Sequence, residues 1–266
     1  MSNQSPWVNY PTLGFAGGEP RPVIGRVSAE EAAAMAGLDV KQAIDWVQYD
    51  TKYYVAGTAV NSADQIFFSV PINGQDSLGN NSAVVFSKTQ MATNMVQGGQ
   101  LQRGNILIVE SLQAQITIPG NLDSTLQASG NTTLPLATGT AVGAATATAG
   151  VLLGNIYSAI AKSGVIRLKI GNKEFERGPL EQFPSEFGGS GFNSLVQAGT
   201  SPATSIPVND GIINNGFGFA RMFRQPRQIV AGQNFGVYLN FFNPFNPSRN
   251  FDITIALRGI LFEDVS

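Results

Sequence analysis

The sequence predicts an all-β protein, and three observations lead to this prediction. From residue 51 onward, apolar and polar residues alternate over long stretches, which is the pattern of half-buried strands. Gly, Asn and Pro residues separate these stretches, as expected for turns. Hydrophobic residues make up 43% of the 266-residue chain, which is enough to form a sizeable core.

The first segment, residues 1–27, is predicted to be an extended arm. It contains four prolines and four glycines, and its aromatic residues follow neither a helical nor a strand period. Such an arm either hangs free or lies across a neighbouring surface. The apolar side chains of Trp7, Tyr10 and Phe15 favour the second alternative and are the candidate arm contacts.

The next segment, residues 28–50, is predicted to be short and helical. Ser28 and Glu31 form a capping box, in which each side chain pairs with a free backbone N–H, and Ala-rich sequence follows up to Gly37. Asp39 is positioned to cap a second short helix that reaches Trp46. Because the segment carries a single basic residue among several acids, we expect packing helices rather than a DNA-binding pair.

The remaining residues, 51–266, are predicted to form one β-domain with eight strands. The turn dipeptides Asn73-Gly74 and Asn243-Pro244 illustrate the boundaries between them. The acidic stretch with Glu174, Glu176 and Glu181 is interpreted as the rim of a turn. The expected strands cover residues 51–57, 66–72, 82–88, 106–118, 166–170, 217–230, 235–241 and 251–261, with Ile66, Phe68, Val70 and Ile72 sharing one face, and Ile106, Ile108, Leu112, Ala114, Ile116 and Ile118 another.

A long insertion, residues 119–163, separates the fourth and fifth expected strands. The part from Ser124 to Ala161 carries no charge, and its second half has apolar residues at helical spacing around Gly150-x-x-x-Gly154. A membrane-inserting helix is one interpretation. Polar and glycine residues interrupt the apolar run, however, so we expect a connector helix that packs on the β-domain.

Composition excludes many functions. The chain has no His and no Cys, which removes His- or Cys-dependent catalysis, disulfides and the usual zinc, haem and iron–sulfur sites. Charged residues make up 13% of the chain, about half the usual share, and 21 Asn and 17 Gln outnumber 16 basic and 18 acidic residues. This pattern fits a surface covered by neighbours in an assembly, or an exported protein that meets sugars. The N-terminal sequence has no apolar signal segment, which favours the first alternative.

Three groups of residues are candidates for chemistry. Glu110 interrupts an apolar strand face, either as a buried glycosidase acid or at a β-bulge. Asp76 lies in an oxygen-rich loop that fits Ca²⁺ or a polar hairpin, and we expect the hairpin. Arg221, Arg224 and Arg227 form a basic cluster that faces either another subunit or nucleic acid. We predict no catalytic residue, no cofactor and no metal site.

The number of strands, the Gly/Asn turns, the long connector and the sparse charge are typical of a jelly roll, in which two antiparallel sheets pack face to face. A single elaborated eight-stranded barrel is the expected form. A double jelly roll is the alternative. It needs about sixteen strands, which is more than the eight expected here.

Two stretches resemble major capsid proteins of small tailless icosahedral phages and viruses. They are KTQMATNMVQGGQLQRGNILIVESLQAQITI, residues 88–118, and RQIVAGQNFGVYLNFFNPFNPSRNFDITIALRGILFEDV, residues 227–265. The resemblance implies a non-enzymatic virion protein, made in the host cytoplasm, with upright barrels grouped into trimeric or pseudo-hexameric capsomers. Its implied partners are copies of itself, minor virion proteins, and nucleic acid or an internal membrane on the inner face.

Two other functions remain open at the level of sequence. A carbohydrate-binding or adhesin-type β-sandwich requires exposed aromatic residues in a groove, and a carboxylate-dependent glycosidase requires Glu110 to act with a second carboxylate.

Overall fold

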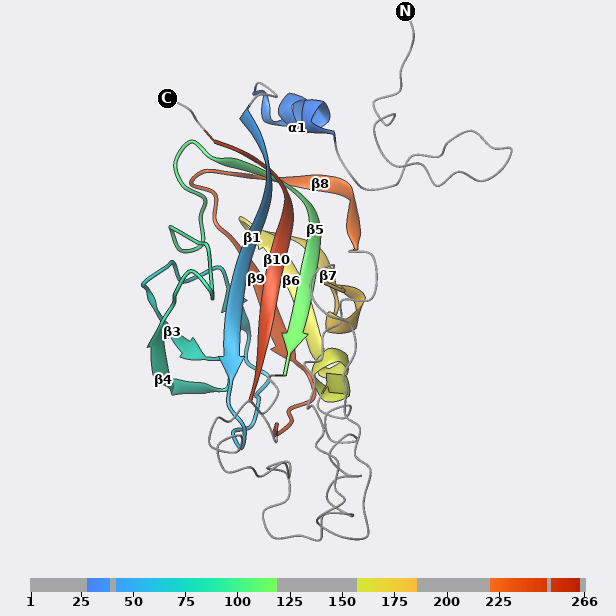
Figure 1. The fold of residues 1–266 in the computed structure, drawn as a ribbon. Helices are drawn as coiled ribbons and strands as arrows, with labels where there is room; N and C mark the ends of the chain where they lie inside the picture. The colour runs from blue at the N-terminus through green and yellow to red at the C-terminus, as the bar shows by residue number, and fades with distance from the viewer. Residues whose placement is uncertain (1–27, 39–41, 119–156, 186–220, 248–249, 264–266) are drawn as a thin grey trace, which may run out of the picture.

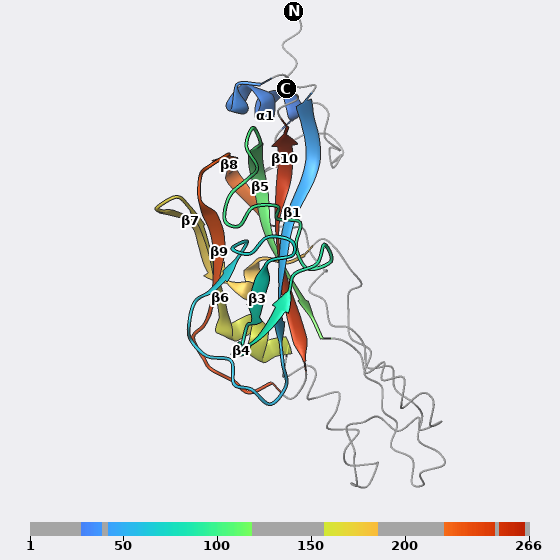
Figure 2. The same ribbon diagram turned by 90° about the vertical axis from the view of Figure 1, so that its left-hand side faces the viewer.

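The computed structural model describes residues 28–38, 42–118, 157–185, 221–247 and 250–263. Most of these residues lie in antiparallel strands, so the all-β prediction is confirmed. Two four-stranded sheets face each other (Figures 1 and 2), and the main apolar core fills the space between them.

The first sheet contains the longest strands of the described chain. Its order is β1 (Ala43–Tyr54), β10 (Phe251–Phe262), β5 (Ile106–Thr117) and β8 (Met222–Val230). β1 pairs with β10 along its entire length, and β10 pairs with β5 over nearly all of theirs. The expected inward residues of β10, from Phe251 to Ile255, alternate as predicted with the half-buried Asp252 and Thr254.

The second sheet is smaller and has the order β2 (Gln65–Phe67), β9 (Phe235–Phe241), β6 (Gly164–Ile170) and β7 (Lys173–Pro179). The period-two pattern of β6 and β9 is confirmed. Ile166, Leu168 and Ile170 point into the core, as do the apolar residues of β9, while Arg167 and Lys169 lie on the outer face.

Three smaller elements complete the described fold. A hairpin of β3 (Gln75–Leu78) and β4 (Asn81–Ser87) lies beside β1 (Figure 1), and a 3₁₀ turn, η3 (Leu180–Gln182), follows β7. The helix α1 (Ala29–Ala36) begins at the predicted capping box: the Ser28 hydroxyl accepts from the Glu31 amide at 3.1 Å, and the Glu31 carboxylate accepts from the Ser28 amide at 3.3 Å. The helix packs on Ile108, Ile260 and Phe262 of the first sheet.

A β-bulge at Glu110 corrects the predicted face of β5. Val109 pairs with Gly259, and Ser111 pairs with Arg258, so Glu110 is the extra residue. The bulge reverses which side chains point inward. Leu107 and Val109 therefore face the main core together with the even-numbered residues from Leu112 onward, whereas Ile108 packs under α1.

The predicted second helix is wrong over residues 43–46, and so is the start of the β-domain at residue 51. Residue 42 lies in a 3₁₀ turn, and β1 already starts at Ala43. The local acids and alanines favoured a helix, but Trp46, Val47, Tyr49 and Thr51 prefer strands, and pairing with all of β10 outweighs local helix propensity.

Two further strand predictions need correction. β2 ends at Phe67, because Phe68 adopts the left-handed conformation with φ 67°, and Phe67 and Phe68 are both buried while Ile66 faces outward. Glu174 and Glu176, read as part of a turn rim, lie in the strand β7, which completes the set of eight strands in the two sheets, and Glu181 lies in η3. The predicted strand at 82–88 instead belongs to the β3–β4 hairpin.

The end of the predicted connector helix lies within the described residues. Residues 157–163 are helical, and Ile160 and Ala161 are buried in the main core. Within the described part of the chain, no helix is long and apolar enough to cross a membrane. The predicted arm, residues 1–27, and most of the insertion lie outside the described residues.

We predict that Gly259→Ala destabilises the fold by about 3 kcal/mol. A Cβ atom at Gly259 would lie 1.8 Å from the carbonyl oxygen of Ile108, so the central pair of strands would have to separate at the bulge. Gly236→Ala in β9 is the control, because its Cβ would meet its nearest neighbour at 3.4 Å. Urea unfolding of both variants measures the difference, and equal losses would contradict this account of the bulge.

Candidate functional site

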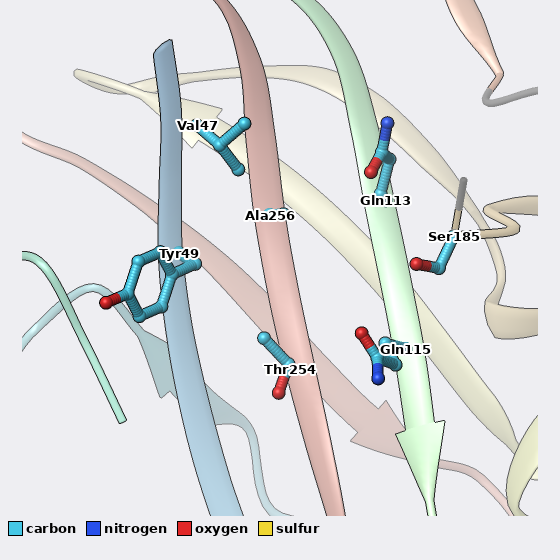
Figure 3. A pocket seen from close by; sticks show the side chains of 7 residues that line it. All are labelled: Val47, Tyr49, Gln113, Gln115, Ser185, Thr254 and Ala256. Atoms are coloured by element: carbon cyan, nitrogen blue, oxygen red, sulfur yellow. The ribbon is translucent and has the colours of Figure 1, made fainter. Parts of the chain in front are cut away.

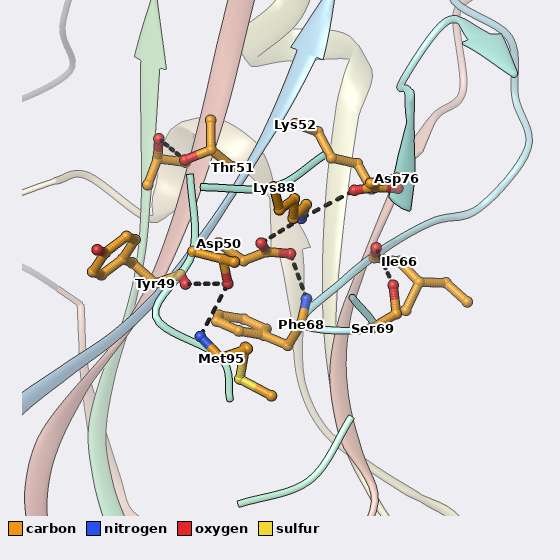
Figure 4. A network of polar contacts seen from close by, with 12 residues as sticks. Tyr49, Asp50, Thr51, Lys52, Ile66, Phe68, Ser69, Asp76, Lys88 and Met95 are labelled. Atoms are coloured by element: carbon orange, nitrogen blue, oxygen red, sulfur yellow. Dashed lines mark hydrogen bonds and ion pairs between the residues drawn. The ribbon is translucent and has the colours of Figure 1, made fainter. Parts of the chain in front are cut away.

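The most unusual feature of the described interior is a chain of four charged side chains (Figure 4). Asp50 and Lys52 project from β1, Asp76 comes from β3, and Lys88 follows β4. Lys88 and Asp50 have no solvent exposure, and Asp76 and Lys52 are nearly as buried. The two carboxylates balance the two ammonium groups, so the cluster as a whole is neutral.

Lys88 is the centre of this buried network. Its Nζ lies 2.5 Å from Asp50 Oδ1 and 3.0 Å from Asp76 Oδ2. Lys52 Nζ donates to both oxygens of Asp76, at 3.0 and 3.1 Å. The ion pairs therefore join the first sheet to the hairpin through two carboxylates that share one ammonium group.

The backbone after β2 is tied to the same network. The Phe68 amide donates to Asp50 Oδ2 at 2.6 Å, and Phe68 is the residue with positive φ where the chain leaves β2. At the other end of the hairpin, the Asn80 side chain donates to the carbonyls of Val55 and Thr58 and accepts from the Val55 amide. The hairpin is thus fixed to the end of β1 at two places.

Burial and pairing act against each other on the two carboxyl groups. Burial raises the pKa of Asp50, while Lys88 and the Phe68 amide work to lower it. Burial also acts to raise the pKa of Asp76, but Lys52 and Lys88 outweigh it, so the pKa of Asp76 falls below its usual value. Burial raises the pKa of Tyr54 well above its usual value, and the charge of Asp76 adds to this effect.

The geometry of the network gives it a structural role. A carboxylate without solvent exposure cannot exchange a proton with a substrate, which general acid–base catalysis requires. Asp76, the candidate Ca²⁺ ligand, lies in the strand β3 and is buried, whereas a polar hairpin loop was expected at this position. Its oxygens are bound by ammonium groups. Among the described residues, no group of three or more acidic side chains is arranged to hold a metal ion.

The candidate arginines are close in sequence but differ in environment. Arg221 pairs with Glu176 at 2.7 Å, donates to Gln182 at 3.0 Å and lies over the Phe183 ring. Arg227 lies over the Phe175 ring with its Cζ 5.1 Å from the ring centre. Two of the three arginines therefore connect β8 to the β7–η3 segment, and Arg224 is exposed at the edge of the first sheet.

Glu110 is buried at the bulge described above, which agrees with the bulge interpretation of this residue. The carboxylates that the fold brings together are instead Asp50 and Asp76, and sequence reasoning missed Asp50 and its link to Asp76 through Lys88. One signal was available, since Asp50 and Lys52 share a strand face with the core residue Tyr54. Their partners come from 24 and 38 residues further along the chain, a pairing that no local pattern reveals.

A second candidate surface is apolar and exposed. The β4 strand, NSAVVFS, has no charge, and β3 is its one strand partner in the described part of the chain. Val85 is 62% exposed, and Met91 in the following loop is 89% exposed. Phe242, directly after β9, is 59% exposed. The candidate arm contacts Trp7, Tyr10 and Phe15 lie outside the described residues.

Comparisons of this chain with protein-family models, curated proteins and solved structures find no match. Inference about function therefore depends on the fold and on these surfaces.

We predict that Lys88→Met costs about 3–5 kcal/mol of stability, because it leaves the buried Asp50 carboxylate without its ammonium partner. Asp50→Asn combined with Lys88→Met should recover part of this loss, since the double variant removes both charges. Arg167→Met, which breaks the surface pair with Asp64, is the control and should cost less than about 1 kcal/mol. Urea unfolding midpoints measure these effects, and additive losses in the double variant would exclude the coupling.

A second prediction concerns Asp252, on the outer face of β10 between Tyr53 and Thr117. Burial raises the pKa of Asp252 to about 6, and a hydrogen bond with Thr117 lowers it only in part. Since the pKa in the folded protein exceeds the unfolded value of 3.8, ionisation of Asp252 reduces stability as the pH rises through about 6. Asp252→Asn should therefore stabilise the protein at pH 7.5, by up to about 3 kcal/mol, and have little effect near pH 3.5.

The control for this pH dependence is Asp64→Asn. Burial acts to raise the pKa of Asp64, but the hydrogen bonds from Arg167 and Asn240 and the nearby positive charges together outweigh it and lower the pKa, so this substitution should reduce stability at neutral pH. Unfolding midpoints at both pH values measure the two variants. A destabilised Asp252→Asn protein at pH 7.5 would show that the carboxylate is favourable where it lies.

Proposed function

We propose that this chain is a structural virion protein, a capsid subunit that assembles with copies of itself into capsomers and an icosahedral shell around a genome. We further propose that its fold is a single jelly roll. The observation that carries both proposals is the order of the eight sandwich strands.

The eight strands pair in the manner of a rolled hairpin. Leaving out the β3–β4 hairpin and counting in chain order, the first strand pairs with the eighth, the second with the seventh, the third with the sixth and the fourth with the fifth. The two sheets then have the orders 1-8-3-6 and 2-7-4-5. This order supports the proposal of a jelly roll, an architecture found in viral capsid and lectin domains.

The exposed surfaces support assembly with other subunits. Val85 in the uncharged strand β4 and Met91 in the loop that follows it present exposed apolar side chains. Covering such a surface gains about 25 cal/mol per Å² of apolar area, and no charge must be removed from water. An exposed apolar strand edge is a liability in a protein that stays alone, because it offers unpaired backbone groups to other chains.

The buried network supports the same function through rigidity. It fixes the hairpin to the body of the sandwich, so β4 is held in one position relative to both sheets. A contact surface that is already ordered loses little conformational entropy when a partner binds. We propose that β4 forms part of the contact between subunits.

The basic cluster fits a smaller role in this proposal. Arg221 and Arg227 make contacts within the subunit, whereas Arg224 is exposed and available to an acidic partner. Minor virion proteins and nucleic acid, or an internal membrane, remain proposed partners of the inner face.

We predict that the purified chain forms capsomer-sized oligomers and shells, and that Val85→Asp reduces this assembly at least tenfold. The aspartate would place a charge in a contact that excludes water, whereas the exposed position of Val85 makes a change in folding stability beyond about 0.5 kcal/mol unexpected. Val85→Ile is the matched control and should assemble. Sedimentation velocity and negative-stain microscopy measure assembly, and urea unfolding measures stability.

A chain that remains monomeric at every protein and salt concentration would contradict the proposed function. A monomer that also binds glycans on an array would favour the carbohydrate-binding sandwich instead. Normal assembly of Val85→Asp would contradict the role of β4 while leaving the capsid function in place.

A further inference from the structure

A pocket of about 270 Å³ lies on the outer face of the first sheet (Figure 3). It forms where Tyr49, Ala256 and Gln113 stand side by side on β1, β10 and β5. Ala256, the middle residue of this row, has a small side chain and forms the floor of the pocket. The larger side chains of Tyr49 and Gln113 on either side form its walls. The residues that line the pocket are Val47, Tyr49, Gln113, Gln115, Ser185, Thr254 and Ala256.

One wall of the pocket carries a polar atom without a partner. Gln113 is 1% exposed, and its Nε2 donates to the Ser111 hydroxyl at 3.3 Å, but its Oε1 has no hydrogen-bond partner. A buried acceptor left unsatisfied costs about 1–3 kcal/mol. Figure 3 shows the Gln113 amide beside Ser185 at the border of the pocket. A group that donates one hydrogen bond here would remove this cost.

The pocket therefore selects an apolar body with a single donor. Val47, Ala256 and the ring of Tyr49 supply apolar walls, while Gln113 Oε1 requires an N–H or O–H. The indole of tryptophan has this chemistry, since its N–H donates and it has no acceptor that would need a partner of its own. A cavity of roughly 150 Å³ accepts benzene, so the larger volume here has room for a two-ring side chain.

The chain contains two tryptophans, and one of them is already engaged. Trp46 lies on β1 and donates its indole N–H to Gln48 Oε1 at 3.2 Å. Trp7 belongs to residues 1–27, the part of the chain that precedes the capping residue Ser28.

We propose that the indole of Trp7 docks in this pocket and donates its N–H to Gln113 Oε1. The first described element, α1, lies on the same outer face of the first sheet as the pocket, because it packs on Ile108 and Ile260. Ile260 is four residues from Ala256 along β10, a distance of about 13 Å. The 21 residues from Trp7 to Ser28 span up to about 70 Å when extended. The arm is long enough to fill the pocket of its own subunit or of a neighbouring copy.

The proposal is tested by fluorescence of a protein in which Trp7 is the one tryptophan. In Trp46→Phe, we expect blue-shifted Trp7 emission and protection from acrylamide. Adding Ala256→Leu, which fills the floor of the pocket, should shift the emission to that of exposed tryptophan and raise the acrylamide quenching constant about threefold. Val165→Leu, on the outer face of the second sheet, is the matched control and should change neither value.

A second measurement keeps the test decisive if Ala256→Leu affects folding. In Trp7→Ala the pocket is vacated, so free indole at millimolar concentration should bind and shift the NMR signals of Gln113 and Ala256, and Gln113→Leu should weaken this binding at least fivefold. If Trp7 docks within its own subunit, its protection from acrylamide is independent of protein concentration. If it docks on a neighbouring copy, the protection increases with protein concentration. Both results support the proposal.

The proposal is overturned if Trp7 is exposed in the folded protein at all concentrations. It is also overturned if Trp7 is protected but insensitive to Ala256→Leu, or if indole does not bind to Trp7→Ala. The measurements use unassembled protein, so they neither depend on the capsid function nor decide it.

Discussion

The shared ammonium group of Lys88 is the interaction on which the placement of the smaller elements depends. It contacts Asp50 and Asp76 together in a region almost without solvent. Asp76 also pairs with Lys52, whereas Lys88 is the ammonium partner of Asp50 among the described residues. An apolar cluster of the same volume would often be as stable as a buried ion network. The network instead fixes the position of the hairpin, since Lys88 contacts both carboxylates at once in a single arrangement of the hairpin relative to β1. The left-handed turn at Phe68 is held by the same Asp50 side chain, so the network also fixes where β2 ends.

The bulge at Glu110 organises the opposite end of the first sheet. By inserting one residue into β5, it allows Leu107 and Val109 to face the main core while Ile108 turns outward to α1. Without this change of phase, Ile108 would point into the main core, and it would not contribute to the apolar surface under α1. The outer face is consequently divided into a part covered by α1 and a part with the mainly apolar pocket around Ala256, and the central β10 strand crosses both.

Much of the sandwich was predictable because its central strands are buried on one face. The alternation in β6, β9 and the first half of β10 reports directly on that burial, and the capping box at Ser28 is a local interaction that sequence spacing specifies. The errors arose where distant contacts decide the structure. Residues 43–46 became a strand because β10 pairs with them, and the polar stretch at Glu174 and Glu176 became an edge strand through pairing with β6. The ion network was missed for the same reason, since its partners come from different elements.

The distribution of charge differs from that of an ordinary surface, and the difference has a physical reason. Four charged residues are buried inside the subunit. A buried charge without its partner is costly, so these four side chains favour one arrangement of the elements that carry them. The hairpin that they position is apolar and uncharged on its exposed strand. Charges in a contact between subunits would have to be desolvated each time a contact forms, whereas charges within a subunit are desolvated once, during folding. Under the proposed function, a subunit that places a contact surface accurately and then covers it with a partner gains from this division. The low overall charge of 13%, in a chain rich in Asn and Gln, fits that proposal.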